Sequence, residues 1–169
     1  MQFELKPLSK DAIPEALAKA HRYRLLGEPS QAESICLDVL RLEPAHREAL
    51  VTLLLAITDQ FETGVPLSRA RDVLQSLSGD YERAYYAGIV SERSARARMK
   101  QIRLGANFKA YEEFIEAMRC YEEAEGLRPP GNDDAILRWN TCARTLMRYR
   151  ELRPEPKENP EPIVLDAES

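Results

Sequence analysis

The residues of this chain that could perform catalysis or bind a metal are few and widely spaced. His21 and His46 are the only histidines and fall in different segments, while Cys36, Cys120 and Cys142 are far apart in the sequence. Zinc ligands recur at short fixed spacings such as Cys-x-x-Cys, and phosphate loops are rich in glycine; neither pattern occurs here. The sequence therefore predicts no metal, no cofactor and no catalytic site, and we expect a protein that is not an enzyme.

Charged residues form two consecutive runs. The basic run comprises Arg93, Arg96, Arg98, Lys100 and Arg103, and the acidic run that comes after it comprises Glu112, Glu113, Glu116, Glu122, Glu123 and Glu125. If these runs pair across a helical hairpin, they form a solvated face, in which each exposed pair contributes only about 0–1 kcal/mol. If the basic run is free, it forms a site for an anion or RNA. The net charge of -4 and the lack of aromatic residues between the arginines disfavour nucleic-acid binding. Anion or RNA binding is therefore the alternative function and not the leading one.

Glycines and prolines divide the chain into helix-sized segments, within which apolar residues recur at helical spacing. The predicted helices span residues 11–26, 30–42, 46–62, 67–77, 80–103, 107–126 and 133–152. No stretch alternates strictly between apolar and polar residues as an exposed strand does. The predicted fold class is therefore all-α. Ser30 and Glu33 stand at the spacing of a capping box, which predicts that Ser30 caps the second helix.

One helical domain is flanked by two short segments. A chain of 169 residues, 44% apolar and 31% charged, suffices for one globular domain. We expect a lead-in over residues 1–10, a helical domain over 11–152, and an extended or disordered tail over 153–169, where prolines alternate with acidic residues. The apolar segment Ile163–Leu165 is a candidate for docking on a neighbouring helix. No signal-peptide pattern or membrane-spanning apolar run is evident, so we expect a cytoplasmic protein without a membrane partner.

Two stretches share one pattern of small and apolar residues. Residues 32–44 and 117–129 each begin with alanine, followed by an apolar or aromatic residue at +4, a smaller apolar residue at +7, leucine at +10 and proline at +12. The alanine allows a neighbouring helix to approach closely, and the residues at +4 and +7 share its helical face. The proline ends the helix and redirects the chain.

This pattern resembles the tetratricopeptide repeat, a helix–turn–helix unit of roughly 34 residues. The residues that carry the resemblance are Tyr23, Gly27, Ala32 and Pro44 in the first unit, Ala70, Leu74 and Leu77 in a weaker middle copy, and Ala84, Gly88, Ala117, Tyr121, Ala124, Leu127 and Pro129 in the third. The alanines are farther apart than the family's period, so the middle units contain longer helices or loops. Over residues 11–152 the resemblance implies an α–α superhelix of about three hairpins with a C-terminal capping helix.

The resemblance also implies a concave surface, lined by the first helix of each pair, that binds a peptide, a helix or a protein. The positions carried over as partner contacts are His21, Arg24, Leu55, Asp59, Tyr85, Ile89, Arg93, Asn140 and Arg144. Aromatic and arginine side chains are frequent interface anchors, but Leu55, Tyr85 and Ile89 could equally pack between helices. The register of the last helix is open by one residue. The predicted function is a protein-interaction scaffold or adaptor, with a homodimer through the same face as another form of it.

Overall fold

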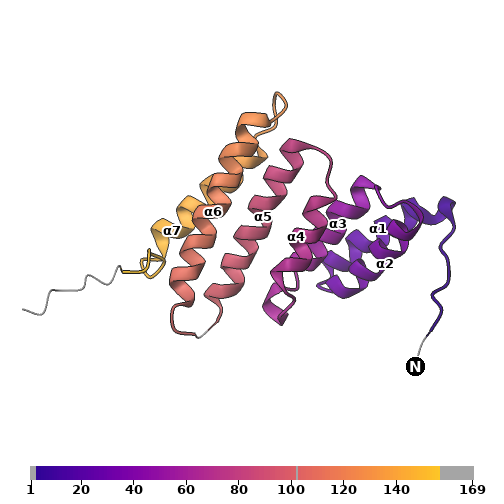
Figure 1. The fold of residues 1–169 in the computed structure, drawn as a ribbon, viewed down its shortest axis with the longest axis horizontal. Helices are drawn as coiled ribbons and strands as arrows, with labels where there is room; N and C mark the ends of the chain where they lie inside the picture. Colours follow the sequence, from indigo (N-terminus) through magenta and orange to yellow (C-terminus); the bar gives the residue numbers. More distant parts are fainter. Residues whose placement is uncertain (1–2, 102, 157–169) are drawn as a thin grey trace, which may run out of the picture.

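The computed structural model describes residues 3–101 and 103–156, and these residues form seven α-helices and no strand. The elements are η1 (Lys10–Ala12), α1 (Ile13–Leu25), α2 (Pro29–Leu42), α3 (Arg47–Thr58), η2 (Phe61–Thr63), α4 (Leu67–Gln75), α5 (Asp80–Met99), α6 (Ala106–Leu127) and α7 (Asp134–Arg148). Each α-helix packs against the next one along the chain, so the helices succeed one another along the long axis of the molecule (Figure 1). The all-α fold predicted from the sequence is confirmed.

Three helices end four residues earlier than predicted: α3 at Thr58, α5 at Met99, and α7, which was predicted over 133–152, at Arg148. The segment predicted as one helix over 46–62 ends at Thr58, and side chains bind carbonyls of its last turn. The Thr58 hydroxyl donates to the Leu55 carbonyl at 2.8 Å, and the Gln60 amide donates to the Ala56 carbonyl at 3.1 Å. Gly64 then turns the chain with a φ of 96°. The helix predicted over 80–103 likewise ends early, at Met99.

The predicted capping box at the second helix is wrong. Helix α2 begins at Pro29, whose ring suits the first helical position, so Ser30 lies inside the first turn and does not cap it. Glu33 makes tertiary contacts instead. Its carboxylate accepts from Gln60 Nε2 at 2.7 Å and pairs with Arg69 of α4.

The small residues of the repeat pattern lie in the core, as the sequence predicts. Ala32, Ala70 and Ala117 are fully buried between helices. Gly88 of α5 faces the ring of Tyr121 of α6 so closely that an added Cβ would lie 2.4 Å from Tyr121 Cε1. The buried residues form one cluster centred on α1 to α4 and a second on α5 to α7.

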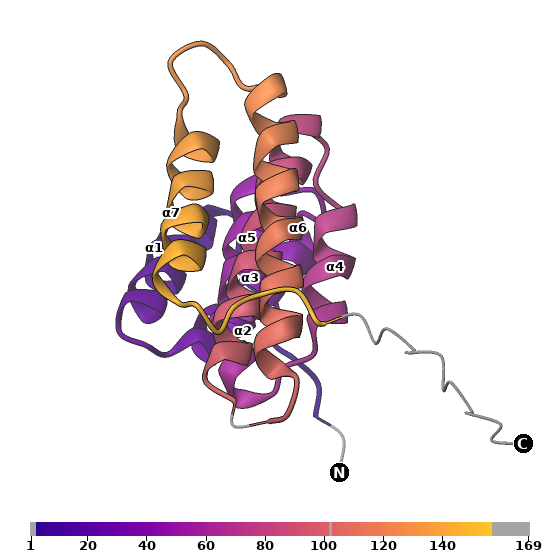
Figure 2. The same cartoon turned by 90° about the vertical axis from the view of Figure 1, so that its left-hand side faces the viewer.

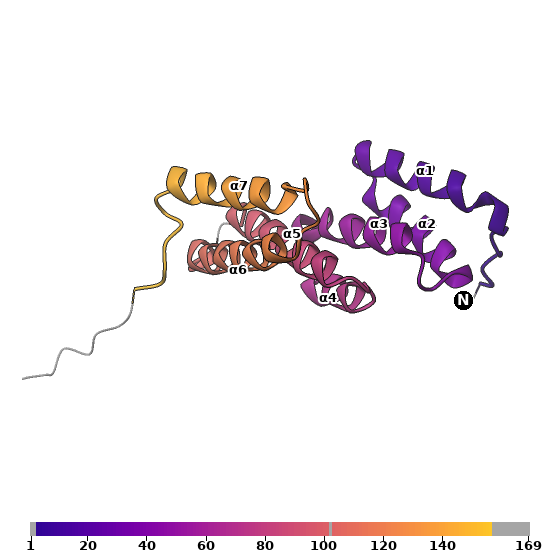
Figure 3. The same cartoon turned by 90° about the horizontal axis from the view of Figure 1, so that it is seen from above.

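The helices at the two ends of the molecule lie on the same side of its centre. Seen from above, α1 and α7 are on one side of α3 and α5, and α4 is on the other (Figure 3). The view along the molecule shows α6 and α7 from the side, with the segment after α7 crossing in front of α6 (Figure 2). We call the side of α3 and α5 between α1 and α7 the inner face.

The chain after α7 is exposed over residues 153–156 and has no regular structure there. The rest of the predicted tail, including Ile163–Leu165, lies outside the described residues. No helix in the described part of the chain combines the length and apolar character that crossing a bilayer requires.

Candidate functional site

Polar side chains connect the odd-numbered helices across the inner face. Between α1 and α3, His21 Nε2 lies 3.0 Å from Glu48 Oε1, and Arg24 Nε donates to Asp59 Oδ2 at 2.7 Å. His21 and Arg24 are three residues apart and therefore share one side of α1. Both were predicted as partner contacts, and both also hold α1 against α3.

Asp59 continues these contacts from α3 to α5. Its other carboxylate oxygen pairs with Arg93, whose Nη1 also donates to Thr58 Oγ1 at 2.7 Å and to the Leu55 carbonyl at 3.3 Å. Burial lowers the pKa of Arg93 and the charge of Asp59 opposes that shift, so the guanidinium stays charged at neutral pH. One carboxylate thus holds arginines from two helices.

A buried carboxylate connects α5 to α6 and α7. Glu92 is 1% exposed and accepts hydrogen bonds from Tyr121 Oη at 2.8 Å and from Arg96 Nε at 3.0 Å. Arg138 of α7 lies 3.7 Å from the same carboxylate. Burial, followed by the charge of Glu92, raises the pKa of Tyr121, so its hydroxyl remains a proton donor. A buried charge needs such partners to offset its desolvation.

Apolar and aromatic side chains lie between these ion pairs. Val51 and Leu55 of α3 are half-buried. Tyr85 of α5, also half-buried, stacks on Tyr81 with ring centroids 5.9 Å apart and meets Tyr86 edge-on at 5.2 Å. At the rim, Leu25 of α1 is 89% exposed. The inner face therefore combines fixed charges with accessible apolar surface, a composition typical of protein interfaces.

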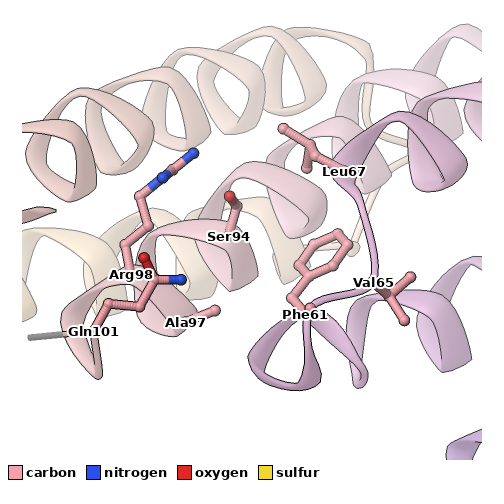
Figure 4. Close-up of a pocket in the computed structure, with 8 residues that line it drawn as sticks. Phe61, Val65, Leu67, Ser94, Ala97, Arg98 and Gln101 are labelled. Carbon is pink, nitrogen blue, oxygen red and sulfur yellow. The ribbon is translucent and has the colours of Figure 1, made fainter. Parts of the chain in front are cut away.

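Two small cavities lie between α5 and the segment that connects α3 to α4. One, of about 230 Å³, is lined by polar groups that include Asp59, Glu62, Arg93 and Arg96. The other, of about 200 Å³, opens between Phe61, Val65 and Leu67 on one side and Ser94, Ala97, Arg98 and Gln101 on the other (Figure 4). Phe61 and Ala97 line both cavities, so the two are neighbours. Their size suits a single amino-acid side chain.

Three of the predicted contact residues lie elsewhere than expected. Ile89 is buried in the second core cluster, so the alternative of packing between helices applies to it. On α7 it is Arg138 that turns toward α5; Asn140, about 200° further around the helix, lies on the opposite side. Arg144 is exposed, about 120° from Arg138 around the helix. The difference between Asn140 and Arg138 is two residues, which is more than the one-residue ambiguity predicted for the register of the last helix.

The basic run is largely neutralised by contacts within the chain. Arg93 pairs with Asp59, Arg96 with Glu92, Arg98 with Glu113 at 2.7 Å and Lys100 with Glu62 at 2.7 Å. Arg96 also lies over the ring of Phe114, 5.7 Å from its centroid. Only Arg103 of this run has no ion pair with a described residue. The pairing of Arg98 with Glu113 joins the basic and acidic runs across the α5–α6 hairpin.

The cysteines have the environment of structural thiols. Cys36 and Cys142 are buried, and Cys120 is partly buried. Burial is the main cause that raises the pKa of Cys36 and of Cys142 to about 12, and that of Cys120 to about 11. Within residues 3–101 and 103–156, no group of three or more His, Cys, Asp and Glu side chains could hold a metal ion.

The central role of Glu92 and Arg138 was missed among the predicted contacts. Glu92 lies among small residues on α5 and faces a tyrosine on one neighbouring helix and an arginine on another. This arrangement can be recognised only when the packing order of the helices is known.

Comparison with known proteins found no matching family model, no matching curated protein and no matching solved structure.

Proposed function

We propose that this chain is a non-catalytic scaffold or adaptor of the tetratricopeptide-repeat type, which binds a peptide, helix or protein on its inner face. The observation that carries this proposal is the composition of that face. Ion pairs fix α1, α3, α5 and α7 relative to one another, and half-exposed Leu55 and Tyr85 lie between them. A face held rigid before binding loses little conformational entropy when a partner docks.

The neutralised basic run disfavours the alternative of RNA binding. Nucleic-acid affinity comes mainly from lysine and arginine side chains that release counterions from phosphates. Four of the five cations of the run already hold carboxylates of this chain, and a phosphate would have to displace them. The free thiols support a reducing compartment, so we propose the cytoplasm as the site of action.

Two adjacent leucines provide a matched test. Leu25 is 89% exposed and lies near His21 on the inner side of α1, whereas Leu26 is 65% exposed and points about 100° further around, away from α3. A partner is first captured by the tagged wild-type chain from an extract of the producing cells and identified by mass spectrometry. Leu25→Glu should reduce its capture at least about tenfold, because a charge then faces an apolar contact.

Leu26→Glu should leave capture unchanged, since the same charge is added to a surface outside the interface. Both variants should keep the wild-type unfolding temperature because both side chains are exposed in the free chain. If the chain forms a homodimer through the inner face, the tagged chain captures untagged copies of itself, and Leu25→Glu reduces that capture as well. Equal losses for the two variants, or none for Leu25→Glu, would remove the inner face as the partner site.

A further inference from the structure

A second concave site lies at the end of the molecule where the α5–α6 turn meets the segment after α7. It is a cavity of about 470 Å³. Its lining includes Arg103 and Gly105 from the turn, Phe108 from the first turn of α6, and Arg150, Glu151 and Arg153 from the segment after α7. No residue of the inner face lines this cavity, so a ligand could bind there whether or not the inner face holds a partner.

The segment after α7 is anchored, and this places two of its arginines beside the turn. Leu152 is buried in the second core cluster, and its backbone N–H donates to the Tyr149 carbonyl at 3.0 Å. Arg150 and Arg153, on either side of Leu152, therefore stay at the mouth of the cavity. Arg103 reaches it from a different part of the chain.

These three arginines differ from the four paired cations of the basic run, because no described carboxylate pairs with them. Among residues 3–101 and 103–156, no carboxylate is within 4.0 Å of the charged nitrogens of Arg103, Arg150 or Arg153, whereas Arg93, Arg96, Arg98 and Lys100 are all paired. Glu151 is the one acidic residue that lines the cavity. Three guanidinium groups against one carboxylate leave a concave surface with a net positive charge.

The N-terminus of α6 adds to the positive charge of this cavity. Helix α6 begins at Ala106, and its N-cap is Gly105, which has a φ of 77° and no side chain to satisfy the first N–H groups. Free N–H groups at a helix start carry a partial positive charge and bind oxyanions. This helix end only reinforces the site, because the convergence of arginines from two segments on one cavity is what points to an anion.

We propose that this cavity binds a phosphoryl group carried by a small organic molecule or by a phosphorylated side chain. Arginine presents a planar fork of donors that matches two oxygens of a phosphate at once, and three forks match a group with three oxygens and up to two charges. A carboxylate offers fewer oxygens and one charge. Phe108 supplies an apolar wall for the organic part, and the volume falls in the usual range for small-ligand pockets of about 300–1,000 Å³.

The test is a titration of the full, ¹⁵N-labelled chain with inorganic phosphate at constant ionic strength, monitored by NMR. The amide signals of residues 105–108 should shift with a saturable curve, and equal ionic strength of sodium chloride should not reproduce the shifts. In the Arg103→Gln/Arg150→Gln variant the apparent dissociation constant should rise at least about tenfold, because two of the three donors are lost. The Arg22→Gln/Arg71→Gln variant removes the same charge from exposed sites elsewhere and should behave as the wild type.

Two further ligands distinguish the sources of the phosphoryl group. Tighter binding of a phosphoserine peptide than of adenosine monophosphate, with the same loss in the Arg103→Gln/Arg150→Gln variant, identifies a phosphorylated protein as the source; the reverse order identifies a nucleotide. The proposal is overturned if phosphate leaves the signals of 105–108 unmoved, or if the two double variants weaken binding equally.

Discussion

At the scale of single residues, the contact between α5 and α6 leaves no room for a side chain at Gly88. A Cβ there would lie 2.4 Å from Tyr121 Cε1, and the Tyr121 hydroxyl is tied to Glu92 at 2.8 Å. Gly88→Ala should therefore lower the free energy of unfolding by about 1–3 kcal/mol, although alanine favours helix by nearly 1 kcal/mol. Urea unfolding monitored by circular dichroism measures the change.

Gly126 provides the control for Gly88. It also lies in a helix, α6, but a Cβ added there would meet nothing within 4 Å. Gly126→Ala should leave stability unchanged or raise it by up to about 1 kcal/mol, since only helix propensity acts. If both variants are equally stable, α5 and α6 do not meet closely at Gly88 and Tyr121.

The hydrogen bond between Tyr121 and Glu92 gives a second prediction. Tyr121→Phe should destabilise the fold by about 1.5–3 kcal/mol, because it removes a donor from a buried carboxylate. In a Glu92→Gln background the same substitution should have a smaller effect, since the acceptor is then neutral. A double-mutant cycle of unfolding free energies measures the coupling, and a coupling of zero would show that the two side chains act independently.

The buried thiols predict a loss of stability at alkaline pH. Burial raises the pKa of Cys36 and of Cys142 to about 12, whereas unfolded thiols ionise near pH 8.5. Above about pH 8.5 the unfolded chain loses these protons and the folded chain does not, so the contribution of the thiols to stability is complete below that pH and falls as pH rises toward 12. At pH 10 the loss should be on the order of 1–2 kcal/mol per thiol.

This pH dependence has its own readout. The urea midpoint is measured at pH 7 and pH 10 for the wild type and for Cys36→Ala/Cys142→Ala. The decline between the two pH values should be smaller in the variant, even if the variant is less stable throughout. An identical decline would assign the alkaline sensitivity to other groups.

At the scale of elements, Asp59 joins three helices through one side chain. It holds Arg24 of α1 and Arg93 of α5, and each of these side chains is no more than 26% exposed. Asp59→Ala should lower the free energy of unfolding by about 1–3 kcal/mol, more than an exposed pair contributes and less than a fully buried one. Asp80→Asn, which breaks a pair with Arg83 whose aspartate is 75% exposed, should lower it by at most about 1 kcal/mol. Equal effects would contradict the bridging role of Asp59.

The helices were predictable from the sequence because their signals are local. Apolar periodicity and breaks at glycine and proline located all seven, and the buried Ala32, Ala70 and Ala117 stand where the repeat pattern places close contacts. The side of α7 that faces α5 was not predictable. Arg138 and Asn140 are two residues apart, and this difference turns a helix by about 200°, which moves the contact from one side of α7 to the other. The end of α3 was also missed, since Thr58 and Gln60 bind its carbonyls through side chains.

The burial of Ile89 and Glu92 depends on how the helices pack against one another, and the residue pattern of a single sequence does not contain that information. Both lie on α5, and both are covered by neighbouring helices rather than by solvent. A glutamate reads as a surface residue in a periodicity argument. Its burial becomes intelligible only when Tyr121, Arg96 and Arg138, from three helices, are seen to surround it.

At the scale of the whole molecule, pairing within the chain decides which surfaces remain available for binding. The basic run and several acidic residues neutralise one another, and the two surfaces that we propose for binding are the inner face and the arginine cavity at the start of α6. The two sites share no residue, and the capture and titration experiments therefore test them separately.

Site-specific photo-crosslinking tests the central claim, that the inner face is the partner interface, most directly. A photoreactive amino acid is placed at Ala18 of α1 or Thr141 of α7, both exposed and each one helical turn from a residue of the inner-face contacts. Arg119 and Glu123, exposed on α6, serve as outer positions. Illumination in an extract of the producing cells should join one defined protein to positions 18 and 141 and not to 119 and 123. Crosslinks from the α6 positions alone, or equally from all four, would contradict the claim.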